Sequence, residues 1–172
     1  MKKEKKHRKP SLKVVRSRKV VIDASGLILG RLASYVAKRL LFGEEVIVVN
    51  SEKAIISGSK KYITEKFKKK LSTRTLSSQK KAPIHARRPE TYVRRVVRGM
   101  LPWSKKPTKG KIAYGRLRVY AGLPAALGEC STQTIPKAKK NIMPFMTVGK
   151  LMEIFGWNNP LKEITVNIPQ TN

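Results

Sequence analysis

Residues 83–102 have the sequence Pro-Ile-His-Ala-Arg-Arg-Pro-Glu-Thr-Tyr-Val-Arg-Arg-Val-Val-Arg-Gly-Met-Leu-Pro, which combines apolar residues at helical spacing with a cluster of arginines. Pro89 suits the first turn of a helix, where its missing N–H costs nothing, and Glu90 favours the positive end of the helix dipole. We therefore predict a helix that begins at Pro89, with one face buried in protein and the other faces offering guanidinium groups to an anionic partner. The predicted apolar stripe consists of Tyr92, Val93, Val96, Val97, Met100 and Leu101.

The net charge is the most informative feature of the composition. The chain has 172 residues, 40% of them apolar, which suits one domain with a proper core. It carries 39 Lys and Arg against 10 Asp and Glu, a formal net charge of +29. Self-repulsion of this size would destabilise a free enzyme, whereas a polyanion neutralises it. We predict RNA or DNA as the partner rather than a membrane, and charge alone does not distinguish the two nucleic acids.

Hydrophobic patterns on both sides of the central stretch predict an α/β fold. Residues 20–23 are an apolar run typical of a strand, and Ser25 could cap the helix that follows. Gly43 suits the left-handed position at the end of that helix. Residues 46–49 are apolar at every position, as in a strand covered on both faces. Strand, helix and strand within about 30 residues form a βαβ unit with a right-handed crossover.

Shorter patterns complete the predicted order of elements. We expect a short strand at 54–56, a charged helix at 59–76, a short helix at 112–115, an alternating strand at 117–121, a last helix at 148–155 closed by Gly156, and an edge strand or extended tail at 164–168. We divide the chain into a basic, disordered arm (1–19), one α/β domain (20–157) and a C-terminal tail (158–172). The arm either stays solvated or becomes ordered on nucleic acid, and the composition favours the second alternative.

The clustering of cations predicts the binding surface. Between Lys66 and Arg118, eighteen lysines and arginines face a single acid, Glu90, so these charges are not balanced as on an ordinary solvated surface. The residues expected to bind nucleic acid are Lys60, Lys61, Lys68, Lys69, Lys70, Arg74, Arg87, Arg88, Arg94, Arg95, Arg98, Lys105, Lys106, Lys109 and Lys111, together with Lys2, Lys3, Lys5, Lys6, Arg8 and Lys9 of the arm.

Three other side chains in this region have two possible roles each. Trp103 and Tyr120 could stack on nucleobases or pack in the fold, and packing is the simpler explanation. His85 could contact a phosphate or base, or be satisfied by backbone in a loop.

Catalytic and cofactor motifs are weak. Gly26 and Gly30 are two glycines four residues apart, not the three of a dinucleotide fingerprint, although Glu52 lies roughly where a ribose-binding acid would sit. Close packing between helix and strand explains the glycines as well. Asp23 is the only aspartate, and we expect it to bond backbone amides at a turn. With two distant histidines and one cysteine, Cys130, we expect no enzyme, metal site, cofactor or small-molecule substrate.

Three motifs, in the same order, resemble those of the large-subunit ribosomal protein L-thirteen family. They are Asp-Ala-Ser-Gly-Leu-Ile-Leu-Gly-Arg-Leu-Ala at 23–33, Val-Arg-Gly-Met-Leu-Pro at 97–102 and Leu-Arg-Val-Tyr-Ala-Gly at 117–122. The resemblance covers about residues 19–157. It implies a three-layer α/β/α fold with a small, mostly parallel central sheet, a basic N-terminal arm and an irregular C-terminal extension.

The resemblance also implies a structural role on the ribosome. By that implication the chain binds large-subunit ribosomal RNA, contributes to subunit assembly, contacts neighbouring ribosomal proteins and resides on cytoplasmic ribosomes. Arg98 would face RNA, Gly99 would allow close packing, and Gly30 and Arg31 would provide a turn and the first helical charge. The arm and the charged segment 60–74 are similar to the archaeal and eukaryotic branch. Leu-Pro-Ala-Ala at 123–126 replaces a His-containing stretch typical of bacterial members.

Two alternatives come from other classes of protein. One is a free-standing DNA-compacting protein, and the other is a nucleotide-dependent enzyme that uses Gly26 and Gly30.

Overall fold

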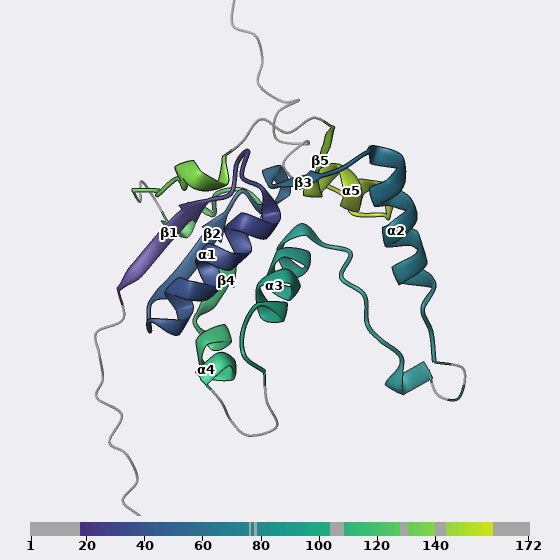
Figure 1. Cartoon of the computed structure of the whole chain (residues 1–172), viewed down its shortest axis with the longest axis horizontal. Helices are drawn as coiled ribbons and strands as arrows, with labels where there is room; N and C mark the ends of the chain where they lie inside the picture. Colours follow the sequence, from purple (N-terminus) through teal and green to yellow (C-terminus); the bar gives the residue numbers. More distant parts are fainter. Residues whose placement is uncertain are drawn as a thin grey trace, which may run out of the picture.

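Two small sheets organise the chain in the computed structural model, which describes residues 18–75, 77, 79–103, 109–127, 131–139 and 144–159. Strands β1 (Lys19–Asp23), β2 (Glu45–Val49) and β4 (Leu117–Val119) form a parallel sheet in the order β1-β2-β4 (Figure 1). Strands β3 (Ile55–Ser57) and β5 (Phe145–Thr147) form a separate antiparallel pair. The predicted element at 164–168 and Cys130 lie outside the described residues.

Within the described residues, five α-helices accompany these strands. They are α1 (Leu29–Leu41), α2 (Lys60–Ser72), α3 (Pro89–Gly99), α4 (Lys109–Gly115) and α5 (Val148–Ile154). The helix predicted to begin at Pro89 is confirmed, with Arg88 as its N-cap residue. The helix predicted for 59–76 ends earlier, at Ser72, where Thr73 adopts an extended conformation. In the described parts of the Pro-containing region between β4 and β5, the chain forms short turns of 3-10 helix.

The parallel sheet places its main helices on one side. Val46 of β2 lies opposite Val20 of β1 and Leu117 of β4, so the chain moves in one direction across the sheet. Right-handed crossovers in one direction put the connecting helices on the same face. Accordingly α1 packs on β2, α3 packs on β4, and the two helices contact each other (Figure 1). The α/β class and the small, mostly parallel sheet are confirmed, but α1 and α3 form a layer on one face of the sheet and do not supply the two outer layers of the predicted α/β/α arrangement.

The two faces of this sheet differ in burial. On the helical face the core includes Val20, Ile22, Val46, Val48, Leu117 and Val119. On the other face Val49 is buried, but Ile47 is partly exposed and the Arg118 side chain is exposed. The prediction that β2 is covered on both faces is therefore right only at Val49, because the crossovers of α1 and α3 lie on the same side. Gln133 forms a parallel bridge with Ile22 and closes the free edge of β1.

The buried stripe of α3 fixes that helix to the core. Val93 and Val97 are fully buried, and Leu101 joins them in the core after the last turn. Met100, which the helical spacing assigned to the same stripe, is 41% exposed. It is the C-cap residue of α3, so the 3.6-residue period no longer applies at this position. The prediction for Met100 is wrong for that reason.

The turn after β1 is built on a carboxylate. The amide and hydroxyl of Ser25 donate to Asp23 Oδ1 at 3.0 and 2.8 Å, and the Asn50 side-chain amide donates to the same oxygen at 2.9 Å. Ser25 is therefore used in the turn and does not cap α1, which starts at Leu29 with Ile28 as its N-cap. Burial opposes the charge of Asp23, but these hydrogen bonds outweigh it and hold the pKa of the carboxyl below its ordinary value.

Among the glycines near α1 and α3, Gly43 has its predicted role, whereas Gly30 and Gly99 do not. Gly26 has a φ of 70° and Gly43 a φ of 98°, so both occupy the left-handed region that glycine permits. Gly30 lies inside α1, and a Cβ added at Gly30 or Gly99 would have no atom within 4 Å. The predictions that Gly30 forms a turn and that Gly99 allows close packing are wrong. In both cases the sequence shows a glycine but not the empty space around it.

Replacing Gly26 and Gly30 by alanine should have opposite effects on stability. Gly26→Ala forces a side chain into the left-handed region and should lower the free energy of unfolding by about 1–2 kcal/mol. Gly30→Ala removes a flexible residue from a helix with open space beside it, and should raise that free energy by about 0.5–1 kcal/mol. Urea denaturation of the two variants checks both signs. A loss of stability in Gly30→Ala would contradict the open surroundings of this position.

The hydrogen bonds of Asp23 should make the stability of the protein depend on pH in the acidic range. Because the folded-state pKa lies below the unfolded one, the carboxylate contributes stability above the ordinary aspartate pKa, and this contribution disappears as the pH falls through the folded value. Asp23→Asn should be less stable than wild type near neutral pH, and the difference should shrink in acid. The effect is modest because the carboxyl is partly exposed. Thermal unfolding of both proteins across the acidic range tests this, and a constant difference would refute it.

Candidate nucleic-acid interface

The arginines of α3 span the whole length of one anchored helix. Arg87 and Arg88 are exposed at its N-terminal end and Arg98 is exposed at its C-terminal end, about 16 Å away along an ideal helix. Arg94 and Arg95 lie between them and are partly buried. Because Val93 and Val97 fix the helix against the core, the spacing of these guanidinium groups is set by the fold.

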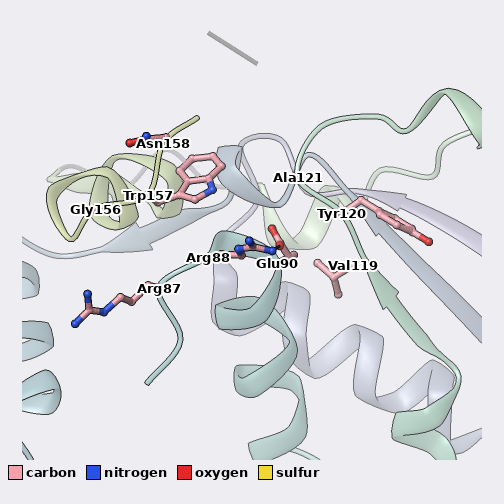
Figure 2. Close-up of a pocket in the computed structure, with 9 residues that line it drawn as sticks. All are labelled: Arg87, Arg88, Glu90, Val119, Tyr120, Ala121, Gly156, Trp157 and Asn158. Carbon is pink, nitrogen blue, oxygen red and sulfur yellow. Dashed lines mark ion pairs between the residues drawn. The ribbon is translucent and has the colours of Figure 1, made fainter. Parts of the chain in front are cut away.

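A cavity of about 790 Å³ lies at the N-terminal end of α3, between residues 119–121 at the end of β4 and residues 156–158 after α5. In Figure 2 Arg88 and Glu90 lie beneath the indole of Trp157, whereas Arg87 and Tyr120 point away from the centre. Arg88 Nη1 is 3.9 Å from Glu90 Oε1, and the arginine is much more exposed than the glutamate. The cavity adjoins the carboxyl end of a parallel strand, where α/β sheets commonly bind ligands. It combines a cation, a carboxylate acceptor and an aromatic wall, which are groups that can receive a nucleotide.

Toward the C-terminal end of α3, two neighbouring rings with an arginine on each form what we call the arginine–aromatic ladder, in the order Arg98, Trp103, Tyr114 and Arg94. The Arg98 guanidinium carbon is 4.4 Å from the centre of the Trp103 ring. The Trp103 and Tyr114 rings meet edge to face, with their centres 5.8 Å apart and an interplanar angle of 84°. The Arg94 guanidinium carbon lies 5.0 Å from the centre of the Tyr114 ring. These distances are typical of cation–π and aromatic contacts.

A glycine allows the ladder to form. A Cβ on Gly110 would lie 2.0 Å from the carbonyl oxygen of Pro102, so α4 approaches the backbone just before Trp103 as closely as only glycine permits. Tyr114 follows one turn later on the same helix and meets Trp103. Sequence reasoning missed both Gly110 and Tyr114. Their spacing of four residues on a short helix was the available signal, but it does not reveal what the helix faces.

The lysines of α2 form a second basic surface. Ile63 and Phe67 are buried, and the Phe67 ring packs 5.8 Å from that of Tyr92 and 4.8 Å from that of Phe155. In Figure 1 α2 lies at the edge of the fold, next to α5. The predicted residues Lys60, Lys61, Lys68, Lys69, Lys70 and Arg74 are all exposed, as are Lys109 and Lys111 on α4. Lys105, Lys106 and the arm residues Lys2, Lys3, Lys5, Lys6, Arg8 and Lys9 lie outside the described residues.

His85 connects the segment that follows α2 to the C-terminal end of that helix. Its Nε2 lies 3.2 Å from the carbonyl oxygen of Thr73, which is hydrogen-bond distance. Of the two roles considered for this residue, the structure supports the loop histidine satisfied by backbone.

The acid considered for ribose binding is committed elsewhere. Glu52 is buried, and its Oε2 accepts a hydrogen bond of 2.9 Å from the amide of Gly122. Together with Gly30 inside α1, this removes the basis for a dinucleotide site. Among the described residues, no group of three or more His, Cys, Asp or Glu side chains is arranged to hold a metal ion. No helix within the described ranges is long and apolar enough to cross a membrane.

Fold and surface together define an α/β protein whose central helix carries arginines at both ends and along its length. Residues 17–126 match the family model described as Ribosomal protein L13, and the chain belongs to this family.

Three relatives, each named large ribosomal subunit protein uL13, show how far the similarity extends. The protein of Methanopyrus kandleri is 43% identical over 145 residues, covering 81% of this chain and 88% of the relative. That of Thermoplasma acidophilum is 53% identical over 137 residues, covering 79% and 97%. That of Methanosphaera stadtmanae is 41% identical over 138 residues, covering 79% and 96%. These relatives are archaeal, which confirms the predicted branch.

Filling the space at Gly110 should disturb the ladder. Gly110→Ala places a methyl group against the Pro102 carbonyl, so backbone must shift at a cost of about 1–3 kcal/mol in the free energy of unfolding. Trp103 should then become more accessible to acrylamide quenching. Gly115→Ala is the matched control on the same helix, because nothing lies within 4 Å of the added carbon. Equal stability of the two variants would show that α4 adapts to the extra methyl group without strain.

Proposed function

We propose that this chain is a structural constituent of the large ribosomal subunit that binds and stabilises ribosomal RNA and contributes to subunit assembly. Membership of the ribosomal protein L13 family and relatives named for the large subunit support this proposal. The observation that carries it is the row of arginines on α3, held by fully buried valines against a small core. A protein with a net charge of +29 needs a polyanion to offset its self-repulsion.

In the proposed mechanism the core is a rigid support and the cations neutralise phosphates. The arginines of α3 form the central contact, and the lysines of α2 and α4 extend it on either side. Phosphate contacts give affinity without sequence preference and weaken steeply with salt, by about 10³- to 10⁵-fold between 50 and 200 mM for six to ten contacts. We further propose that residues 1–19 act as a basic arm, that residues 20–157 form the RNA-binding domain, and that residues 158–172 form a tail. We also propose that the segment 105–111, predicted as a loop but ending in the first turn of α4, reaches into RNA grooves.

The proposed setting is the cytoplasmic ribosome, with neighbouring ribosomal proteins as further partners. The role is structural, so we propose no reaction, cofactor or small-molecule substrate. A free DNA-compacting role is the alternative to exclude. Co-sedimentation of the chain with large subunits supports the ribosomal role, whereas co-purification with DNA after RNase treatment would support the alternative.

The position of the charges, and not only their number, should determine RNA binding. Replacing Lys68, Lys69 and Lys70 of α2 together by Gln should weaken binding to purified large-subunit ribosomal RNA. The slope of log affinity against log salt should fall by about 1 for each phosphate contact that is lost. The triple change leaves Ile63 and Phe67 in place, so we expect the core to stay folded.

A control variant separates local contacts from overall charge. Replacing Lys38, Lys53 and Lys150 by Gln removes the same charge from three exposed positions outside the proposed surface. Its salt slope should change less than that of the α2 variant. Equal slopes would indicate non-specific attraction by net charge and would remove α2 from the proposed interface.

A further inference from the structure

We propose that the arginine–aromatic ladder is a preformed stacking site for an unpaired nucleotide of the RNA, with the base on the exposed end formed by Trp103 and Arg98. This inference rests on the proposed function and adds to it the kind of RNA structure that one end of α3 recognises.

The exposed end of the ladder is organised for contact with a flat ligand. Trp103 remains 44% exposed although its ring touches both Arg98 and Tyr114. Arg98 is exposed as well, so a ligand can reach both side chains from solvent. Nucleobases stack on aromatic rings and on arginine planes in protein–RNA complexes. The Arg98 guanidinium group also keeps N–H donors for a phosphate, which an ammonium group could not present in the same planar arrangement.

The buried end of the ladder holds this surface in place. Arg94 lies over Tyr114, and its Nε is buried without a hydrogen-bond partner among the described residues. Gly110 brings α4 against the Pro102 carbonyl, next to Trp103 in the chain. The two rings are therefore fixed between α3 and α4 before any ligand arrives. A preformed surface reduces the side-chain ordering that binding would otherwise cost.

The surroundings favour RNA over a protein partner. Residues 91–128 contain no Asp or Glu, and Arg95, Lys109 and Lys111 add cations near the ladder. The buried centres of protein interfaces are depleted of charged residues, whereas RNA contacts are rich in them. A paired A-form helix keeps its bases stacked inside, so only a bulged, looped or terminal nucleotide can place its base on Trp103.

The test uses the full chain and purified large-subunit ribosomal RNA. The sequence has two tryptophans, Trp103 and Trp157, so emission from a Trp103→Leu variant reports Trp157 alone, and the difference from wild type reports Trp103. Saturating RNA should quench the Trp103 emission. Trp103→Leu should weaken binding by about 5- to 140-fold, the range expected for one stacked base. The salt slope should stay the same, because no phosphate contact is lost.

Conservative variants separate stacking from charge and from folding. Trp103→Phe keeps a ring and should restore part of the affinity. Arg98→Lys keeps the charge but loses the plane, and should also weaken binding. Arg118→Lys is the control, since this exposed arginine lies on the far face of the sheet, outside the proposed interface, and should bind as wild type does. Circular dichroism of each variant shows whether the fold is kept.

The outcomes distinguish this inference from the function on which it rests. If wild type binds the RNA while Trp103 emission stays constant and Trp103→Leu binds equally well, the stacking site is refuted and the ribosomal role stands. If Trp103→Leu binds naked RNA normally but fails to enter subunits, the ladder contacts a protein, and the inference is again wrong. If wild type itself does not bind the RNA, the proposed function fails.

Discussion

Burial of Val93 and Val97 against α1 and β4 is the contact on which the rest of the structure depends. These two side chains hold α3 in one orientation, and that orientation positions the arginines at both ends of the helix. It also places Phe67 of α2 against Tyr92 and brings Arg94 over Tyr114 of α4. A small apolar contact thereby fixes three separate groups of cations relative to one another.

The same arrangement explains how a small core tolerates so many charges. All described cations of the predicted surface are exposed or partly exposed, so their charges remain hydrated in the free protein. The arginines that stack on rings are hydrated less completely. One face of each guanidinium group contacts an aromatic ring in place of water, and the cation–π interaction compensates for the lost hydration. Arginine suits this role because it is planar and less strongly hydrated than lysine. The structure accordingly uses arginine on α3 beside the core and lysine on α2 facing outward.

Much of the candidate interface could be predicted from residue types, but the contacts within it could not. The exposure of Lys68, Lys69 and Lys70 follows from helical spacing, because Ile63 and Phe67 define the opposite face. Trp103 was open to either stacking on a base or packing, since its neighbours in space come from α3 and α4 rather than from the adjacent sequence. The glycines show the same limit: Gly26 and Gly110 are required by backbone conformation and by close approach, whereas Gly30 and Gly99 stand in open space. The sequence shows the same residue type at all four positions and does not distinguish their surroundings.

The sequence by itself determined the βαβ unit, the position and buried face of α3, and the basic character of the surface, because periodicity and charge are local properties of the chain. Only the tertiary structure decided that α1 and α3 share one face of the sheet, that Ser25 serves the Asp23 turn, and that Arg98, Trp103, Tyr114 and Arg94 form one ladder. The shared helical face and the ladder depend on residues distant in the chain meeting at a set distance, and the Asp23 turn is completed by Asn50, which lies 27 residues away. The direction of the crossovers and the close approach at Gly110 establish those distances, and neither leaves a periodic signal in the sequence.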